Sequence, residues 1–108
     1  MMPRVLIAEP NEDVRALLAL TVNRLGYEAV HAGSSADVDA VLLEPGCPVG
    51  RSVLTRFGDS APPVVCLSIY PRNEDSEPPS SVAHLTKPAS SAAIGAALRV
   101  ALRHLVAV

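Results

Sequence analysis

Four side chains capable of chemistry stand where short apolar runs of the sequence end. Glu9 follows the run RVLIA, Glu44 follows AVLL, Ser68 closes VVCLS, and Lys87 precedes a proline in the last quarter of the chain. Two carboxylates and an ammonium can hold a cation or an anion, and a hydroxyl can add a hydrogen bond. Glu44 is followed at once by a proline and a glycine, which turn the chain into a tight loop. These groups can act together only if the fold brings the ends of the apolar runs to one place.

The apolar runs themselves are typical of strands that are buried on both faces of a parallel sheet. The sequence predicts strands at residues 4–8, 27–32, 39–44 and 63–68, and a fifth that ends near residue 87. Alternation with helices predicts an α/β layer structure. The carboxyl ends of parallel strands lie at one edge of the sheet, where such sheets bind ligands. We therefore expect the four polar groups to share that edge.

Helical periodicity marks the segments between the strands. Residues 11–26 predict a helix capped by Asn11, and residues 89–105 a second one capped by Ser90 or Ser91. Residues 50–58 can form a short helix between them. The expected buried stripe of the first helix is Val14, Leu17, Leu18, Thr21, Val22 and Leu25, and that of the last helix is Ile94, Ala97, Leu98, Ala101, Leu102 and Leu105.

Length and composition favour one small cytoplasmic domain over residues 1–108. A chain of 108 residues can bury a single core, which must be aliphatic because only 3% of the residues are aromatic. A formal net charge of −2 with scattered arginines disfavours nucleic-acid binding. No apolar run is long enough for a signal peptide or a membrane span. The two cysteines have no metal-binding or disulfide pattern, so we expect neither function from them.

In chain order these segments resemble the receiver domain of bacterial response regulators. VLIAEPNEDVRALL is similar to the family's first strand and helix, GYEAVHA to its second strand, DAVLLEPGCP to its third strand and loop, PPVVCLS to its fourth strand, and HLTKPAS to the end of its fifth. The resemblance covers nearly the whole chain. It implies the flavodoxin-like (CheY-like) fold, with five parallel strands in the order 2-1-3-4-5, and a role in two-component (phosphorelay) signal transduction.

The resemblance also implies roles for individual residues. Glu44 stands at the position of the phospho-accepting aspartate, and Glu9 and Pro10 stand where the family has two acidic metal-binding residues. Gly46 would offer the backbone carbonyl that helps to hold magnesium. The remaining matches are Cys47 and Pro48 with the Met-Pro pair of the loop, Ser68 with the switch hydroxyl, Lys87 with the phosphate-binding lysine, Pro88 with a usually cis proline, and His84 with the rotating aromatic.

Two departures from the family pattern weaken this chemistry. Pro10 removes a carboxylate from the magnesium site, and magnesium needs near-octahedral oxygen ligands at about 2.0–2.1 Å. Glu44 is one methylene longer than aspartate, and a displacement of about 1 Å can lower a rate roughly a hundredfold. The same length lets Glu44 reach Lys87 and mimic a phosphoryl group with one negative charge. We expect no cofactor, at best weak magnesium binding by Glu9, Glu44 and Gly46, and a contact between Glu44 and Lys87.

Simpler interpretations of the same residues stay open. Glu44 is alternatively a strand-end carboxylate that pairs with Lys87 and carries no signal. Glu9 is interpreted as a solvated strand-end acid, with half of a residual cation site as the alternative. Ser68 is either a loop cap or a switch hydroxyl. His84 is interpreted as a half-buried packing residue and not as a pH switch.

The link between the second and third expected strands is unusually short. It must cross two strand spacings, about 9.6 Å, and return along a strand, whereas six residues reach at most about 20 Å. We therefore predict that the second helix of the fold is missing or reduced. A rival interpretation makes residues 35–44 that helix, with Ser35 as its cap, at the expense of the third strand. Pro71, Pro78 and Pro79 predict a shortened fourth helix.

These reductions expose one face of the sheet in our interpretation, and an exposed apolar face usually marks a partner or dimer surface. We expect several of its side chains to contact water and a homodimer to cover them. The sequence thus favours a degenerate receiver (pseudo-receiver), not an enzyme, that acts as a phosphorylation-independent protein-interaction module toward a kinase or output protein. The alternatives are a working phospho-acceptor that uses Glu44 or another acid, and a small α/β enzyme that uses Glu9, Glu44 and Lys87.

Overall fold

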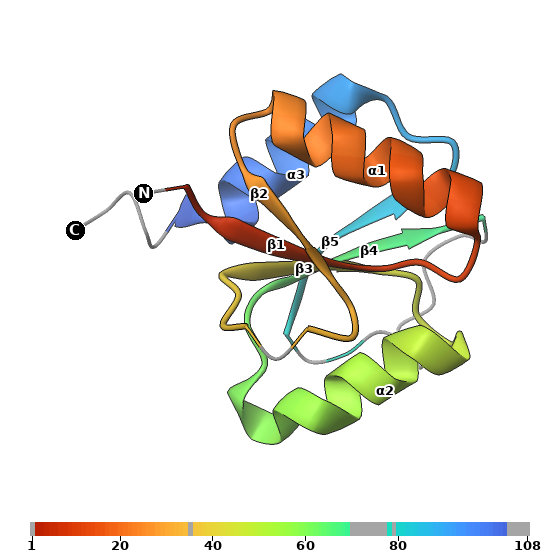
Figure 1. Ribbon diagram of the computed structural model, residues 1–108, viewed down its shortest axis with the longest axis vertical. Coiled ribbons are helices and arrows are strands. Elements are labelled where there is room, and N and C mark those ends of the chain that lie inside the picture. The colour runs from red at the N-terminus through yellow and green to blue at the C-terminus, as the bar shows by residue number, and fades with distance from the viewer. Residues whose placement is uncertain (1, 35, 70–77, 79, 104–108) are drawn as a thin grey trace.

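Five parallel strands form the centre of the molecule. The computed structural model describes residues 2–34, 36–69, 78 and 80–103. Figure 1 shows the strands crossing the middle of the molecule between two layers of helix. The sheet has the order β2-β1-β3-β4-β5, so the predicted fold and strand order are confirmed. The strands are β1 (Arg4–Ala8), β2 (Glu28–His31), β3 (Ala40–Leu43), β4 (Val64–Ser68) and β5 (Ser81–Thr86).

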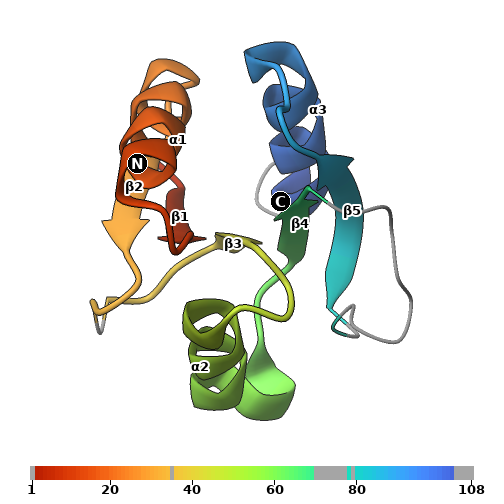
Figure 2. The same ribbon diagram turned by 90° about the vertical axis from the view of Figure 1, so that its right-hand side faces the viewer.

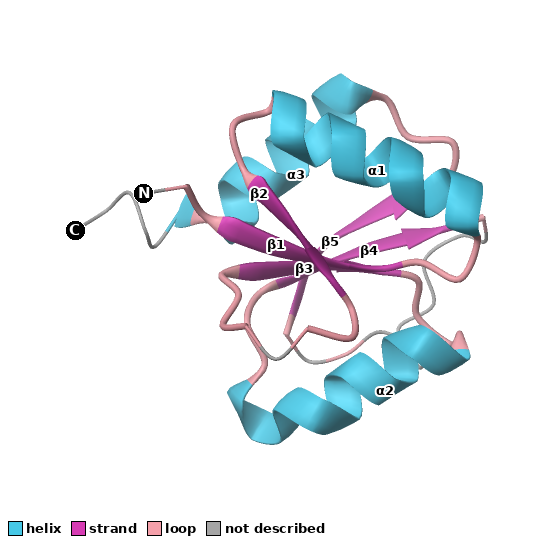
Figure 3. Ribbon diagram, viewed as in Figure 1, coloured by secondary structure: helices cyan, strands magenta, loops and turns pink. Residues whose placement is uncertain are grey.

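Three α-helices lie in the described part of the chain, two on one face of the sheet and one on the other. They are α1 (Glu12–Arg24), α2 (Pro48–Phe57) and α3 (Ser91–Ala101), and a single 3₁₀ turn, Gly58–Ser60, follows α2. Figure 2 shows α1 and α3 side by side and α2 alone on the opposite side, and Figure 3 distinguishes helices from strands by colour. Each helix is capped by a side chain that accepts a hydrogen bond from a backbone N–H of its first turn. The capping residues are Asn11, Cys47 and Ser90.

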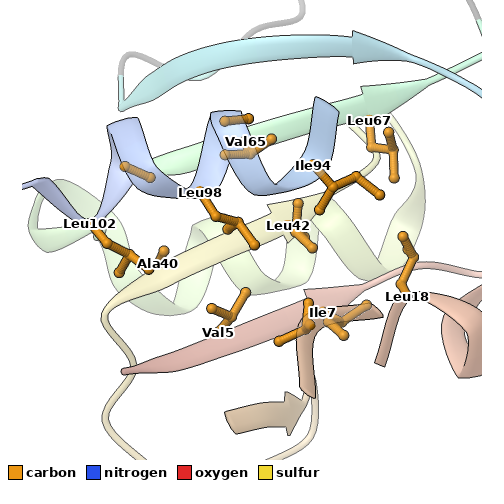
Figure 4. Packing of buried hydrophobic residues seen from close by; sticks show 13 residues of the cluster. Val5, Ile7, Leu18, Ala40, Leu42, Val65, Leu67, Ile94, Leu98 and Leu102 are labelled. Carbon is orange, nitrogen blue, oxygen red and sulfur yellow. The ribbon is translucent and has the colours of Figure 1, made fainter. Parts of the chain in front are cut away.

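The side chains of the central strands divide between two apolar clusters because successive residues of a strand point to opposite faces. Figure 4 shows the larger cluster, in which the strands contact α1 and α3. Its strand members are Val5, Ile7, Ala40, Leu42, Val65 and Leu67, and its helix members include Leu18, Val22, Ile94, Leu98 and Leu102. The smaller cluster packs against α2 and consists of Leu6, Ala8, Val41, Leu43, Val53, Val64 and Cys66.

The rival interpretation of residues 35–44 as a helix is wrong. Residues 40–43 form β3, which pairs with β1 on one side and with β4 on the other. All four residues of AVLL are buried, because the central strand of a parallel sheet is covered on both faces. The described residues between β2 and β3 contain no helix, and Ser35, the proposed cap, lies outside the described residues. The predicted absence of a second helix is confirmed for the described residues of this link.

The expected exposure of the α2 face is wrong for the described central strands. The strand members of the smaller cluster are fully buried even though only one helix lies over them. Ala32 and Val38, from the link between β2 and β3, pack against this cluster. Arg56 of α2 donates hydrogen bonds to the carbonyls of Ala32 at 3.1 Å and Ser34 at 2.8 Å. The described residues of the link therefore contribute to the cover of this face of the sheet.

Two other predictions from the sequence can be compared with the structure. Leu17, expected in the buried stripe of α1, is 64% exposed, because α1 contacts the sheet mainly through Leu18 and Val22. The described residues between β4 and β5, which are residues 69, 78 and 80, are not helical. The rest of the predicted fourth-helix region, including Pro71 and Pro79, lies outside the described residues, as does Leu105. None of the described helices is long and apolar enough to cross a membrane.

Candidate functional site

The predicted site residues meet at the carboxyl edge of the sheet. Glu9 directly follows β1, Glu44 directly follows β3, Ser68 is the last residue of β4, and Lys87 directly follows β5. The strands are parallel and adjacent, so their ends bring residues that are up to 78 positions apart within hydrogen-bonding distance. The sequence thus predicted correctly which edge of the sheet carries the charged groups.

Lys87 connects both carboxylates of this edge. Its Nζ donates one hydrogen bond to Oε1 of Glu9 and another to Oε1 of Glu44, the latter at 3.1 Å. The exposed fractions of the side chains are 4% for Glu9, 20% for Glu44 and 15% for Lys87. We call these three residues the charged triad. The expected contact between Glu44 and Lys87 is present, whereas the interpretation of Glu9 as a solvated acid is wrong.

All three oxygens of Glu9, two in the side chain and one in the backbone, accept hydrogen bonds. Oε2 of its side chain accepts a hydrogen bond from the backbone N–H of Asn11 at 3.1 Å. Its backbone carbonyl accepts one from the guanidinium of Arg15 at 3.3 Å. A buried carboxylate needs such partners because an unpaired buried charge is strongly unfavourable. Glu9 is therefore a fixed structural part of the site.

Two features of the sequence point to these contacts. Lys87 is the only lysine of the chain, and an ammonium has three donors, so one lysine can satisfy two strand-end acids. Arg15 lies close to the start of α1, where a cation is unfavourable beside the positive end of the helix dipole. A cation at that position needs a nearby acceptor, and the carbonyl at the end of β1 provides it.

The electrostatics of the triad favour a charged lysine. Burial alone would lower the pKa of the Lys87 ammonium, but its hydrogen bonds to Glu9 and Glu44 and the two negative charges outweigh burial and raise that pKa above its ordinary value. With both carboxylates ionised, the triad carries a net charge of −1. One negative charge therefore remains at the mouth of the site, at Glu44, which is the more exposed of the two acids.

The loop after β3 fixes the backbone of Glu44. The thiol of Cys47 donates to the Glu44 carbonyl at 3.0 Å, and its sulfur accepts from the backbone N–H of Gly50 at 3.3 Å. A Cβ at Gly50 would lie 2.5 Å from the same carbonyl oxygen, so the chain can approach this closely only with glycine there. Gly46 is exposed and has φ of 84°, a left-handed conformation that glycine adopts without strain.

The other predicted residues have the following places in the structure. Ser68 is buried, and its carbonyl accepts the backbone N–H of Lys87 at 2.8 Å, which fixes the start of the lysine side chain. The peptide bond between Lys87 and Pro88 is cis, as expected. His84 is half-buried on β5 opposite Cys66, in line with a packing role. Pro10 is exposed.

The donor set does not fit a magnesium ion of the kind that the family resemblance implies. Oε1 of Glu9 and Oε1 of Glu44 both accept from the Lys87 ammonium, so a divalent cation would have to displace a positive charge that is already paired. Pro10 contributes no side-chain oxygen. Within the described residues no group of three or more His, Cys, Asp or Glu side chains could hold a metal ion.

Comparison with known proteins identifies the fold. No protein-family model and no curated protein matches the sequence significantly, but solved structures match over almost the whole chain. A signal receiver domain of an HD domain-containing protein from Pseudomonas fluorescens aligns with a TM-score of 0.79 and 22% identity and covers 100% of both chains. A sensor protein from Polaromonas gives 0.78 and 22%, covering 95% of this chain and 98% of that one.

A third similar structure carries a metal. It is the receiver domain of a sensor histidine kinase from Pseudomonas aeruginosa with a magnesium ion coordinated in its active-site cleft, and it aligns with a TM-score of 0.74 and 14% identity over 95% of this chain and 99% of that one. At such low identities the likeness establishes the fold and not the chemistry. The chain has the CheY-like fold of response-regulator receiver domains.

Proposed function

We propose that the chain is a degenerate receiver, a pseudo-receiver, which acts in two-component signal transduction as a protein-interaction module without phosphoryl transfer and without enzymatic activity. The observation that carries this proposal is the charged triad, in which Lys87 pairs with Glu9 and Glu44 at once. The likeness of the fold to receiver domains supports the signalling context. The departures at Glu44 and Pro10 support the loss of chemistry.

The Glu44 carboxylate gives Lys87 a negatively charged hydrogen-bond acceptor, as a phosphoryl group gives one to the lysine of a receiver. A phosphoryl group on the acceptor would place negative oxygens near the lysine ammonium, and a carboxylate is a weaker acceptor of the same sign. Glu44 reaches Lys87 at 3.1 Å without modification. In this proposal the edge of the sheet is therefore held permanently in one state, and a partner recognises that state.

The same contacts disfavour a working phospho-acceptor. An acceptor carboxylate must be free to attack in line, and the phosphoryl oxygens must be neutralised by a divalent cation and a lysine. Here Oε1 of Glu44 accepts a hydrogen bond from Lys87, and Glu9, at a position where the family has a metal-binding acid, pairs with the same ammonium. We propose accordingly that magnesium binds weakly at best. The small-enzyme alternative has no specific support, because Lys87 pairs with both carboxylates of its pocket.

A direct test exposes the protein to acetyl phosphate and magnesium and follows its intact mass. The proposal expects no species heavier by one phosphoryl group at times when a competent receiver, run as a control, is fully modified. The variant Glu44→Gln serves as the matched chain that lacks the carboxylate. A mass increase that is present in the native chain and absent from Glu44→Gln would establish the phospho-acceptor alternative.

We propose a signalling protein, either a kinase or an output protein, as the partner, and a homodimer as the form in solution. No nucleic acid or membrane is part of the proposal, since the net charge of −2 offers no basic surface. The buried central strands of the α2 face remove one argument for the dimer, so the dimer has to be tested directly. Sedimentation over a range of concentrations does so, and a strict monomer at high concentration would refute this part of the proposal.

A further inference from the structure

A hollow of about 340 Å³ lies beside the charged triad, on the side of the sheet edge where β1 and β2 end. The end of β2 and the start of the link that follows it form one wall of the hollow. The lining comes from both layers of the fold, since Arg15 belongs to α1 and Arg56 to α2. The volume is at the lower end of the range for small-molecule pockets, about 300–1,000 Å³. The complete lining is Ile7, Glu9, Arg15, His31, Ala32, Gly33, Val49, Ser52, Val53 and Arg56.

The charges of the lining are unbalanced toward positive. Arg15 and Arg56 contribute two positive charges to the lining, and Glu9 contributes its one carboxylate. Both oxygens of this carboxylate are already engaged, by Lys87 and by the backbone N–H of Asn11. The negative charge is thus neutralised from outside the hollow, whereas the positive charges of the two arginines are not paired with an acid in the lining.

The donors of the hollow are held in place before any ligand arrives. Arg56 binds two backbone carbonyls through one nitrogen, and its guanidinium lies 4.9 Å from the centre of the Phe57 ring. Arg15 binds the carbonyl of Glu9 through one nitrogen. Each guanidinium has five N–H donors, so each keeps donors for a ligand. Side chains that are fixed in advance lose less entropy on binding.

His31 is a further polar residue of the lining. Its Nδ1 accepts a hydrogen bond from the backbone N–H of Gly33 at 2.9 Å. In a neutral imidazole one nitrogen accepts and the other carries the proton, so the proton of His31 is on Nε2, which can donate. The floor of the hollow is apolar and includes the half-buried side chains of Ala32 and Val49 and the buried side chain of Val53, which pack in the smaller cluster. An apolar floor beneath several fixed donors matches a ligand with an apolar body and an anionic head.

We propose that this hollow binds a small organic anion, which places a phosphonate, phosphate, sulfonate or carboxylate head on Arg15 and Arg56 and its apolar part against the half-buried Ala32 and Val49. The hollow shares Glu9 with the charged triad, but the proposed binding uses no contact of Glu44 and does not rest on the proposed interaction function. Its ligand binds against the link that covers the α2 face, so occupation of the hollow stabilises that link.

Phenylphosphonate is a suitable probe, since its carbon–phosphorus bond prevents phosphoryl transfer to Glu44. In a titration followed by amide NMR, we expect saturable shifts that are concentrated at Ala32, Gly33, Ser52 and Val53. Inorganic phosphate tests the anionic head alone and should bind about tenfold more weakly, because it buries no apolar surface. Benzyl alcohol tests the apolar body alone and should show no saturation in the same range.

Arginine variants locate the site. Arg15→Gln and Arg56→Gln should each weaken phenylphosphonate at least about fivefold through the loss of charge-assisted hydrogen bonds. Arg51→Gln is the matched control, because Arg51 lies on α2 and is exposed but does not line the hollow; it should change the affinity less than about twofold. Arg15→Gln leaves the link untouched, so it tests the site even if Arg56→Gln loosens the link. Equal weakening by all three variants, or no saturation with the native chain, would overturn the proposal.

Discussion

The two faces of the sheet are closed by different means. On one face α1 and α3 bury a large apolar cluster through side chains such as Leu18 and Leu98. On the other face, α2 and an irregular link together cover the strands. Arg56 fixes this link by hydrogen bonds to its carbonyls. The first face depends on packed apolar volume, whereas the second depends in part on a few polar contacts. The comparison implies that the same kind of substitution has different effects on the two faces.

The largest expected difference between the faces concerns apolar truncation. Leu98→Ala removes a fully buried side chain from the cluster under α3, and such substitutions lower the free energy of unfolding by about 2–5 kcal/mol. Val38→Ala truncates a half-buried residue of the link and should lower it by no more than about 1 kcal/mol. Denaturant unfolding of both variants measures the difference. Equal losses would show that the link packs as tightly as the helices.

The charged triad lies between the two faces, and its disruption should rank second. Lys87→Met leaves the buried Glu9 and the nearby Glu44 without their shared cation, and we expect a loss of about 1–3 kcal/mol in the free energy of unfolding. The double variant Glu9→Gln/Lys87→Met removes the buried negative charge as well and should recover part of that loss. If the double variant is less stable than Lys87→Met by the full effect of Glu9→Gln, the two residues do not interact and the triad is wrongly described.

The third expected effect is local to the link. Arg56→Gln removes donors to the carbonyls of Ala32 and Ser34, and we expect a loss of about 0.5–1.5 kcal/mol per hydrogen bond at most. The amide of Ser34, which donates to the carbonyl of His31 at 2.9 Å, should lose protection from hydrogen exchange more than amides of β4. Arg51→Gln changes the same charge on the same helix and should leave this protection unchanged. Uniform loss of protection throughout the chain would indicate that Arg56 stabilises the whole fold and not the link.

The sequence predicted those features that depend on periodicity and on strand ends. Buried strands such as AVLL could be recognised because a central parallel strand is apolar throughout, and the groups after those strands had to share one edge. The partner of Glu9 was missed, because an acid after a strand looks the same whether it is solvated or paired with a lysine 78 residues away. The cover of the α2 face was missed for a similar reason, since Arg56 and the carbonyls that it binds are more than 20 residues apart. Long-range polar contacts leave no local pattern.

The smallest expected effect is a change with pH in the stability that Lys87 contributes, and it depends only on the polar contacts of the charged triad. Glu9 and Glu44 raise the pKa of Lys87 against the opposing effect of burial. A raised pKa in the folded state stabilises the fold fully below the ordinary lysine pKa of about 10.4, and this contribution is lost as the pH rises through the folded value. The difference in unfolding free energy between the native chain and Lys87→Met should therefore be constant from pH 7 to about 9.5 and shrink above about 10.4.

The single lysine of the chain allows this pKa to be measured directly. Titration of its ¹³Cε resonance by NMR reports Lys87 alone, because no other lysine contributes a signal. We expect a pKa above the ordinary value in the native chain and a lower one in Glu44→Gln, which removes one of the two charges that hold the proton. Leu98→Ala, if it stays folded, should leave the pKa unchanged, since Leu98 packs in the cluster under α3 and not beside the triad. A pKa at or below the ordinary lysine value in the native chain would mean that burial outweighs the two carboxylates, and that Lys87 is not held between them.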